Sequence, residues 1–259
     1  MYTEQALRKR LKTSVFGNKI YTFETIDSTN NCAKAIAGCW GEEGTVVIAE
    51  QQTAGKGRLG RVWEASPNEN LMFSIVLRPK VTPGGLNLLP LYAAVAIAEA
   101  VERTTGLKVE CKWPNDLLVG KRKIAGILIE GSVKQNTVEY VVIGIGINVN
   151  QKRFVGELQS KATSLSLETG KEVDRAELFR TILSSLEQHY NSIGANGFNS
   201  IIPLWVSRST MINRPISVSQ QGNVMSGIVK GLSTDGGLIL QSNGMEKTLF
   251  AGDVTIVGM

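Results

Sequence analysis

Histidine and cysteine are scarce in this 259-residue sequence, which contains one histidine, His189, and three cysteines. A Ser-His-Asp hydrolase needs a histidine beside its nucleophile, and a zinc site usually needs several histidine or cysteine ligands. His189 falls within an expected helix, so both classes of site are disfavoured. The cysteines, Cys32, Cys39 and Cys111, are odd in number and lack C-x-x-C spacing, which favours free thiols and a cytoplasmic location.

Long hydrophobic runs and a strong excess of one charge are also lacking. The longest apolar run, residues 140–149, is about half the length of a transmembrane helix, and residues 1–16 lack the apolar centre of a signal peptide. The net charge of +5 suits an anionic ligand or an acidic partner but is small for a nucleic-acid-binding domain. The basic residues between Arg8 and Lys12 are interpreted as the solvated face of a short helix. No membrane association is expected.

The apolar pattern predicts two domains, and the 42% of hydrophobic residues are enough for a sizeable core. Residues 1–210 are expected to form an α+β domain in which helices pack against a mixed, largely antiparallel sheet. Its helices are expected at residues 3–12, 27–38, 88–105, 174–193 and 198–207. Its strands are expected at residues 19–25, 45–50, 71–77, 109–113, 116–119, 123–130 and 138–148. After Arg214-Pro215, short alternating strands with glycine-rich turns predict a small β-barrel over residues 211–259, with strands at 216–220, 224–231, 237–241, 247–251 and 254–257.

A glycine-rich segment, Gly-Lys-Gly-Arg-Leu-Gly-Arg-Val at residues 55–62, fits the G-x-G-x-x-G pattern. A dinucleotide-binding fold needs a helix directly after such a loop, whereas here Trp63 and then an expected strand follow. A protein kinase would also need VAIK, HRD and DFG segments, which the sequence lacks. Two interpretations remain: a solvated hairpin tip, or an anion-binding loop that uses the three close cations Lys56, Arg58 and Arg61.

Further short motifs surround this loop in a fixed order along the chain. They are Asp27-Ser28-Thr29-Asn30, Ala49-Glu50-Gln51-Gln52, Lys112-Trp113-Pro114-Asn115-Asp116-Leu117, Arg122-Lys123-Ile124-Ala125-Gly126-Ile127-Leu128-Ile129-Glu130, Gly144-Ile145-Gly146-Ile147-Asn148-Val149 and Asn213-Arg214-Pro215-Ile216. From about residue 20 to the C-terminus, the sequence resembles the biotin protein ligase family in these motifs. The resemblance implies a catalytic domain of the class II aminoacyl-tRNA synthetase-like type, followed by an SH3-like barrel.

The same resemblance implies an ATP-dependent ligase that joins biotin, through biotinyl-5′-AMP, to a specific lysine of a biotin carboxyl carrier protein. ATP, biotin and Mg²⁺ are the implied substrates and cofactor. Two alternatives remain: a lipoate-type ligase, which shares the fold and the adenylate chemistry, and a non-catalytic sensor of biotin or nucleotide. Some family members carry an N-terminal helix-turn-helix domain, for which the roughly twenty residues before the expected catalytic domain are too few. We therefore expect no sequence-specific DNA binding, and a monomer or weak homodimer.

The resemblance also implies which residues bind biotin. These are Ser28, Thr29, Asn30, Gln52, Lys56, Gly57, Arg58 and Lys123. The ureido ring of biotin needs hydrogen-bond donors and acceptors, which the polar members of this set supply. Ser28 and Thr29 also suit a helix N-cap, and the two roles can coexist. Gln52 has the alternative of a plain strand-end residue.

Lys123 begins an expected strand that is apolar on both faces. A lysine buried there costs several kcal/mol unless an anion neutralises it, and the alternative is that its ammonium reaches water at the strand end. By resemblance, Lys123 holds the biotin carboxylate and the α-phosphate as they react. Lys123 and Arg58 are the predicted catalytic residues.

The nucleotide and the metal complete the implied site. The resemblance assigns the nucleotide to Arg61, Trp63, Asn115, Asn148 and Arg214, and Mg²⁺ to Asp116. Trp63 would stack on adenine, although it also suits a core. Asp116 follows Pro114-Asn115 and also suits a turn, but its carboxylate oxygens are ligands that Mg²⁺ prefers. At Lys56 the family usually has arginine, so this chain keeps the charge there but loses bidentate geometry.

Overall fold

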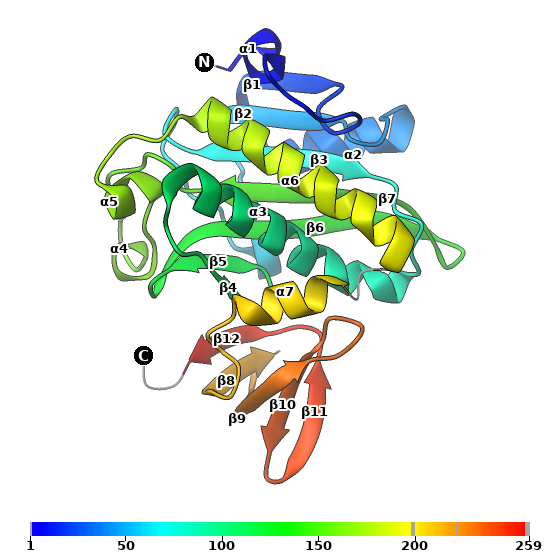
Figure 1. The fold of residues 1–259 in the computed structure, drawn as a ribbon, viewed down its shortest axis with the longest axis vertical. Coiled ribbons are helices and arrows are strands. Elements are labelled where there is room, and N and C mark those ends of the chain that lie inside the picture. The colour runs from blue at the N-terminus through cyan, green and yellow to red at the C-terminus, as the bar shows by residue number, and fades with distance from the viewer. Residues whose placement is uncertain (1, 198–199, 221, 257–259) are drawn as a thin grey trace.

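The computed structural model describes residues 2–197, 200–220 and 222–256. Figure 1 shows a large sheet crossed on its near face by α3 (Leu89–Thr105) and α6 (Arg175–Asn196). A smaller all-β part lies below α7 (Ile201–Ser207) in the same view. The α+β class predicted from the sequence is confirmed.

The large sheet is mixed and largely antiparallel, as predicted. Its order is β1 (Ile20–Ile26), β2 (Val46–Gln52), β3 (Leu71–Leu77), β7 (Thr137–Ile147), β6 (Arg122–Lys134), β5 (Asp116–Val119) and β4 (Glu110–Lys112). The pair β1 and β2 is parallel, because α2 (Thr29–Cys39) crosses between the two strands. All other neighbours in this sheet are antiparallel.

Both faces of this sheet are covered, which follows from the alternation of side chains along its strands. In β2, Val46 and Ile48 belong to the large core shared with α3 and α6. Val47 points the other way, into a second cluster with Ala33 and Ala37 of α2. The first turn of α2 is thereby fixed against the sheet, at the place where the Asp27-Ser28-Thr29-Asn30 motif lies.

The helices agree with the predictions in position and differ at their ends. Asp174 caps α6, since its Oδ1 accepts from the backbone N–H groups of Ala176 and Glu177 at 2.9 and 3.1 Å. The helix expected at 3–12 was predicted too long: α1 spans Glu4–Arg8, and Arg10 has a left-handed φ of 69°. The start of the helix expected at 198–207 falls on residues 198–199, which lie outside the described residues, and α7 is assigned from Ile201.

Several short elements were not predicted, namely η1 (Arg58–Gly60), η2 (Pro83–Leu88), α4 (Leu158–Lys161) and α5 (Leu165–Thr169). Pro83–Thr105, which joins η2 to α3, has the length and composition of a membrane-spanning helix, but 67% of its most apolar window is buried within the fold. That burial is what a core helix shows.

The C-terminal part contains the five strands that the sequence predicted. Their order is β11 (Met245–Leu249), β10 (Leu238–Ser242), β9 (Asn223–Leu232), β8 (Pro215–Gln220) and β12 (Asp253–Ile256), all antiparallel. The final residue of the strand expected at 254–257 lies outside the described residues. The indole N–H of Trp113 donates to the Gly236 carbonyl at 3.2 Å and ties this part to the large domain.

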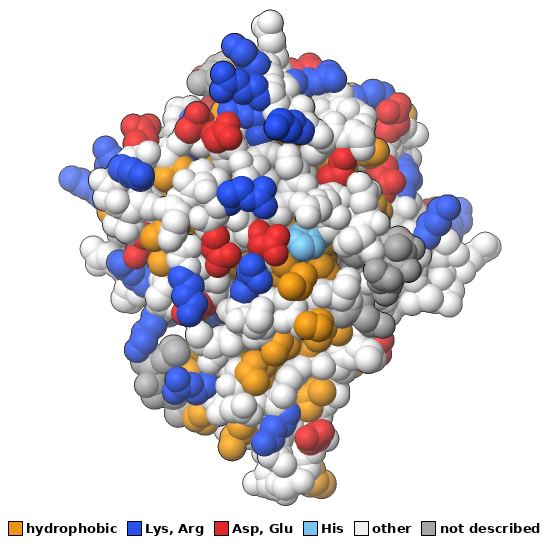
Figure 2. Space-filling view, viewed as in Figure 1, with side chains coloured by type: hydrophobic (Ala, Val, Ile, Leu, Met, Phe, Trp, Pro, Cys, Tyr) orange, Lys and Arg blue, Asp and Glu red, His pale blue; other side chains and the backbone are white. Residues whose placement is uncertain are grey.

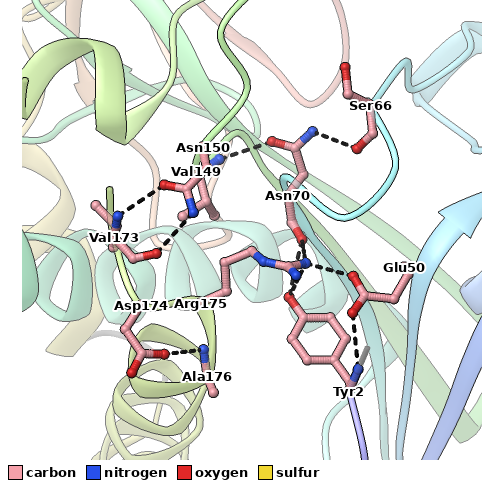
Figure 3. A network of polar contacts seen from close by, with 10 residues as sticks. All are labelled: Tyr2, Glu50, Ser66, Asn70, Val149, Asn150, Val173, Asp174, Arg175 and Ala176. Atoms are coloured by element: carbon pink, nitrogen blue, oxygen red, sulfur yellow. Dashed lines mark hydrogen bonds and ion pairs between the residues drawn. The ribbon is translucent and has the colours of Figure 1, made fainter. Parts of the chain in front are cut away.

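A buried polar network joins the N-terminal segment to the large domain (Figure 3). Arg175, the first residue of α6, donates to Glu50 at 2.6 Å, to the Tyr2 hydroxyl at 2.8 Å and to the Asn70 carbonyl at 3.1 Å. The side chain of Asn70 accepts from Val149 N at 3.0 Å. The network therefore fixes the ends of β2 and β7, whose last residues reach the site described below.

The single histidine lies on the helical face of the molecule. Figure 2 shows it beside acidic side chains, and its Nε2 lies 2.7 Å from Glu99 Oε2. Arg208 contacts Glu99 and Glu102 at 3.5 and 3.4 Å in the same cluster. These contacts link α6, α3 and the end of α7, so His189 has a structural role.

Candidate active site

A pocket of about 750 Å³ lies across strands β7, β6, β5 and β4 of the large sheet, beside β12 of the C-terminal part. It contains nearly all of the residues that the sequence nominated. These are Ser28, Thr29, Asn30, Gln52, Lys56, Gly57, Arg58, Arg61, Trp63, Asn115, Asp116, Lys123 and Asn148. Arg214 does not line the pocket: it is exposed, and its backbone pairs with Met211 and Val229.

The glycine-rich segment is a closed hairpin. Gly57 N donates to the Arg61 carbonyl at 2.7 Å, and Trp63 N donates to the Gly55 carbonyl at 3.0 Å. At its tip, Leu59 has a left-handed φ of 55° and is 72% exposed. A leucine adopts that backbone conformation only at a cost, and packing does not offset it because most of the side chain is in solvent.

The three cations of this hairpin have different partners. Lys56 Nζ donates to Asn31 Oδ1 at 2.6 Å. Arg58 Nη1 donates to Asn115 Oδ1 at 3.3 Å and to the Gly252 carbonyl at 3.5 Å, and burial lowers the pKa of Arg58. Arg61 forms an ion pair with Asp253 of β12. The C-terminal part therefore contributes to the pocket.

The part of the pocket at the start of α2 and the end of β2 is lined by polar, uncharged side chains. Gln52 Oε1 accepts from Thr29 N at 2.7 Å and from its hydroxyl at 3.0 Å. Ser28 holds the N-cap position of α2 but makes no capping hydrogen bond with its side chain, so the N-cap interpretation does not account for the serine hydroxyl. Asn30 Nδ2 donates to Glu130 at 2.8 Å. Hydrogen bonds from Lys34 and Asn30 outweigh burial, which would raise the pKa of Glu130, and keep it low.

Lys123 lines the same pocket as these polar side chains and the cationic hairpin. Its Nζ lies 2.6 Å from Asp116 Oδ1 and 5.5 Å from the centroid of the Trp63 ring. The Lys123 side chain is 32% exposed, so the ammonium is neither deeply buried nor fully solvated. It faces the pocket with one carboxylate and one aromatic ring beside it.

Two glycines of the Gly144-Ile145-Gly146 motif are needed because side chains approach them closely. A Cβ on Gly144 would lie 2.1 Å from Asn30 Oδ1, and one on Gly146 would lie 2.5 Å from Trp63. Each distance is far below van der Waals contact. These glycines thus let Asn30 and Trp63 lie flat against β7.

Two residues expected around the nucleotide, Trp63 and Asn148, line the pocket together with Lys123. Trp63 Nε1 is buried and has no hydrogen-bond partner among the described residues. Buried N–H groups are rarely left unpaired, so this donor is available to a ligand. Asn148 is 4% exposed, and its Nδ2 donates to the Thr163 carbonyl at 3.0 Å.

A magnesium ion would have to use few protein ligands here. Among the described residues, no group of three or more His, Cys, Asp or Glu side chains is placed to hold a metal. Mg²⁺ at nucleotide sites usually keeps several waters and one or two carboxylates. The single Asp116 carboxylate fits an ion that binds together with a triphosphate.

No role was predicted for six charged residues that line the pocket, namely Glu64, Glu110, Lys112, Lys121, Lys161 and Asp253. Lys112 belongs to the Lys112-Trp113-Pro114-Asn115-Asp116 motif but was assigned no role, and Asp253 lies 192 positions after its partner Arg61. The expected alternation in the strand at 109–113 was a usable signal for Lys112, since Cys111 faces the core and its neighbours face away. No comparable signal pointed to Asp253.

Two family models match this chain. Residues 22–148 match the biotin/lipoate A/B protein ligase family, and residues 211–257 match the biotin protein ligase C-terminal domain. The bifunctional ligase/repressor BirA of Bacillus subtilis is 35% identical over 256 residues, which cover 98% of this chain and 79% of that protein. The biotin–[acetyl-CoA-carboxylase] ligase of Paracoccus denitrificans is 33% identical, covering 90% of this chain and 98% of that protein.

A solved structure agrees. The biotin protein ligase from Aquifex aeolicus, in complex with biotin and ATP, superposes with a TM-score of 0.79 at 27% identity. The match covers 92% of this chain and 98% of that one. The likeness therefore includes both the large domain and the C-terminal part.

Proposed function

The chain belongs to the biotin protein ligase family, and on that premise we propose how its pocket carries out the ligation. The reaction is the ATP-dependent attachment of biotin, through biotinyl-5′-AMP, to a lysine of a carrier protein. The observation that carries the proposal is that Lys123 lines one pocket together with polar, uncharged side chains of α2 and β2 and with a cationic loop. Such a pocket suits a neutral ring at one end and phosphates at the other.

Biotin occupies the polar end in this proposal. Ser28, Thr29, Asn30 and Gln52 present donors and acceptors to the ureido ring. The Ser28 hydroxyl, which makes no capping bond, is available to the ligand. The biotin carboxylate then points toward Lys123.

Two nucleophilic displacement steps then take place beside the Lys123 ammonium. The biotin carboxylate attacks the α-phosphorus of ATP and pyrophosphate leaves; the carrier lysine then attacks the acyl carbon and AMP leaves. Neither step needs a protein nucleophile, so alignment and charge stabilisation do most of the work. Lys123 and Arg58 supply the positive charge, and Asp116 orients Lys123 through their 2.6 Å contact.

The glycine-rich hairpin covers the adenylate and excludes water from the mixed anhydride. Arg58 and Arg61 hold phosphate oxygens, Gly57 allows the backbone to approach, and Lys56 keeps the loop beside α2 through Asn31. Trp63, Asn115 and Asn148 surround the base and ribose. Mg²⁺, held by Asp116 and the phosphates, would offset charge on the triphosphate.

Arg214 is exposed and lies outside the pocket. Its proposed effect on the nucleotide is therefore the attraction of a distant positive charge. We propose no direct contact for it.

We also propose the domain division, the cellular location, the acceptor protein and the oligomeric state. The division into a ligase domain, residues 1–210, and an SH3-like domain, residues 211–259, is supported by the two sheets and by the family match at 211–257. A cytoplasmic location is supported by the free thiols of Cys32, Cys39 and Cys111. A biotin carboxyl carrier protein is the proposed acceptor, and the 259-residue chain is proposed to bind no specific DNA sequence and to be a monomer or weak homodimer.

Exchange of labelled pyrophosphate into ATP tests the proposal. Exchange should require biotin and Mg²⁺, and lipoate should not replace biotin. Exchange supported by lipoate would identify a lipoate-type ligase. No exchange with either acid, despite calorimetric binding of biotin, would identify a sensor.

A further inference from the structure

Lys112 is the last residue of β4, the edge strand of the large sheet, and it lines the pocket. Along this strand Cys111 faces the core, 1% exposed, so Lys112 faces away from it. Its Cα pairs with that of Asp116 on β5. The Lys112 side chain is therefore on the pocket side of the sheet, half-buried.

The Lys112 ammonium has no hydrogen bond or ion pair within the described part of the chain. The other half-buried cations of the pocket differ, since Lys123 contacts Asp116 and Arg58 contacts Asn115 and Gly252. Lys108, just before β4, is exposed and does not line the pocket. Burial lowers the pKa of Lys112 and outweighs the opposite effect of the Asp116 and Asp253 carboxylates, neither of which forms an ion pair with it. Such groups are concentrated at functional sites, where a ligand supplies the missing charge.

The order of the strands places Lys112 beyond the reacting atoms. From the end of the pocket at α2, the sheet runs β2, β3, β7, β6, β5 and β4. Lys123 lies on β6, Asp116 on β5 and Lys112 on β4. A substrate with its ureido ring near α2 and its carboxylate at Lys123 therefore has Lys112 on the far side of the α-phosphorus.

Phosphoryl and nucleotidyl transfers bring the attacking and leaving oxygens roughly into line on opposite sides of phosphorus. When the carboxylate attacks from the biotin side, the leaving group departs on the opposite side, toward β4. We propose that Lys112 binds the pyrophosphate that leaves in the adenylation step. The inference rests on the proposed function, because it needs biotin at α2 and ATP across β6 and β5.

The step balances without a proton. A carboxylate oxygen forms a bond to the α-phosphorus as the bond from that phosphorus to the bridging oxygen breaks. The electron pair stays on the bridging oxygen, so pyrophosphate leaves with one more negative charge than it carried within ATP. The Lys112 ammonium neutralises that charge. In the second step no pyrophosphate is present, and Lys112 has no part.

This asymmetry between the two steps defines the experiment. Lys112→Met keeps the aliphatic length without the charge, Lys112→Arg keeps the charge, and Lys108→Met removes an exposed cation that does not line the pocket. Each variant is assayed for biotin-dependent pyrophosphate–ATP exchange and for transfer of biotin from supplied biotinyl-5′-AMP to the carrier domain. Binding of inorganic pyrophosphate alone is measured by calorimetry.

For Lys112→Met we expect exchange to fall by about 10²-fold, as for loss of one charged contact at a transition state, and pyrophosphate affinity to fall about tenfold or more. Transfer from supplied biotinyl-5′-AMP should stay within about twofold of the parent protein. Lys112→Arg should recover most of the exchange, and Lys108→Met should match the parent.

Equal losses in exchange and transfer would overturn the inference, because they would indicate a structural lysine. Normal exchange and normal pyrophosphate binding in Lys112→Met would overturn it as well. Failure of the proposed function is distinguishable, since the parent protein itself would then show no exchange.

Discussion

Lys123 is the second residue of β6, and its ammonium contacts two groups in the pocket. Nζ lies 2.6 Å from Asp116 Oδ1 and 5.5 Å from the centroid of the Trp63 ring. The Lys123→Ala substitution removes this charge and leaves a carboxylate alone beside the reacting atoms. Loss of one charge-stabilising contact typically lowers a rate by about 10²–10³. We expect adenylate synthesis to fall by at least that factor, because both the biotin carboxylate and the α-phosphate lose the cation.

The same substitution should change the stability of the fold only slightly. The Lys123 and Asp116 side chains are 32% and 25% exposed, so solvent screens the pair, and such a pair contributes about 0–1 kcal/mol. The contact with Trp63 contributes about 0.5–1 kcal/mol. A loss of about 1 kcal/mol lowers the Tm of a protein of this size by about 2–4 °C.

Single-turnover formation of biotinyl-5′-AMP measures the first effect, and thermal unfolding measures the second. Lys123→Arg is the matched control: it keeps the charge but changes the shape of the head group, so it should retain more activity than alanine. Near-normal adenylate synthesis in Lys123→Ala would remove Lys123 from the reacting centre. A fall in Tm above about 10 °C would mean that the ion pair is mainly structural.

Gly146→Ala should lower adenylate synthesis at least about tenfold, because its Cβ would lie 2.5 Å from Trp63, whereas Gly38→Ala, with no atom within 4 Å of its Cβ, should not. Glu187 accepts hydrogen bonds from residues 14–16; they outweigh the burial that would raise its pKa and hold that pKa below the usual 4.5. Its stabilisation is therefore complete above about pH 4.5 and is lost as the pH falls. Glu187→Gln should cost about 1–3 kcal/mol in denaturant unfolding at pH 7 and less at pH 3. Binding to DNA should be weak, independent of sequence and lost on raising salt, and a footprint surviving physiological salt would contradict this.

Much of the site was predictable because its residues occur in short segments of unusual composition. Lys123 stands out as a cation at the start of an apolar strand, and the loop at residues 55–62 stands out as cations between glycines. Composition alone left a solvated alternative open for each, and the resemblance to the biotin protein ligase family decided in favour of a site. The strands were predictable for a related reason, since β3 was expected and found at residues 71–77, with all its residues buried.

The parts that escaped prediction depend on contacts between distant segments. Asp253 pairs with Arg61 across 192 positions, and nothing in either segment indicates the other. Gly144 and Gly146 belong to a recognised motif. Glycine is needed there because Asn30 and Trp63 approach the backbone closely, and that approach depends on where α2 and the hairpin pack. The place of Arg214 outside the pocket escaped prediction in the same way, because its position at a domain junction says nothing about the direction in which it points.

We propose that Arg58 keeps the intermediate bound. Its guanidinium donates to Asn115 at 3.3 Å and to the Gly252 carbonyl at 3.5 Å, and it forms no ion pair with the nearby carboxylates of Asp116 and Asp253, so it can bind a phosphate. A charge-assisted contact to phosphate contributes about 1.5–3 kcal/mol, and its loss in Arg58→Gly should speed dissociation of biotinyl-5′-AMP about tenfold to a hundredfold. Synthesis should continue at a reduced rate, since Lys123 remains. The released anhydride would acylate lysines on any protein nearby, so incubation with ATP, biotin and serum albumin should give albumin that binds streptavidin. Unlabelled albumin beside normally modified carrier would refute the role of Arg58 in retention, and would leave Lys56, 2.6 Å from Asn31 at the other side of the hairpin, as the residue that holds the intermediate.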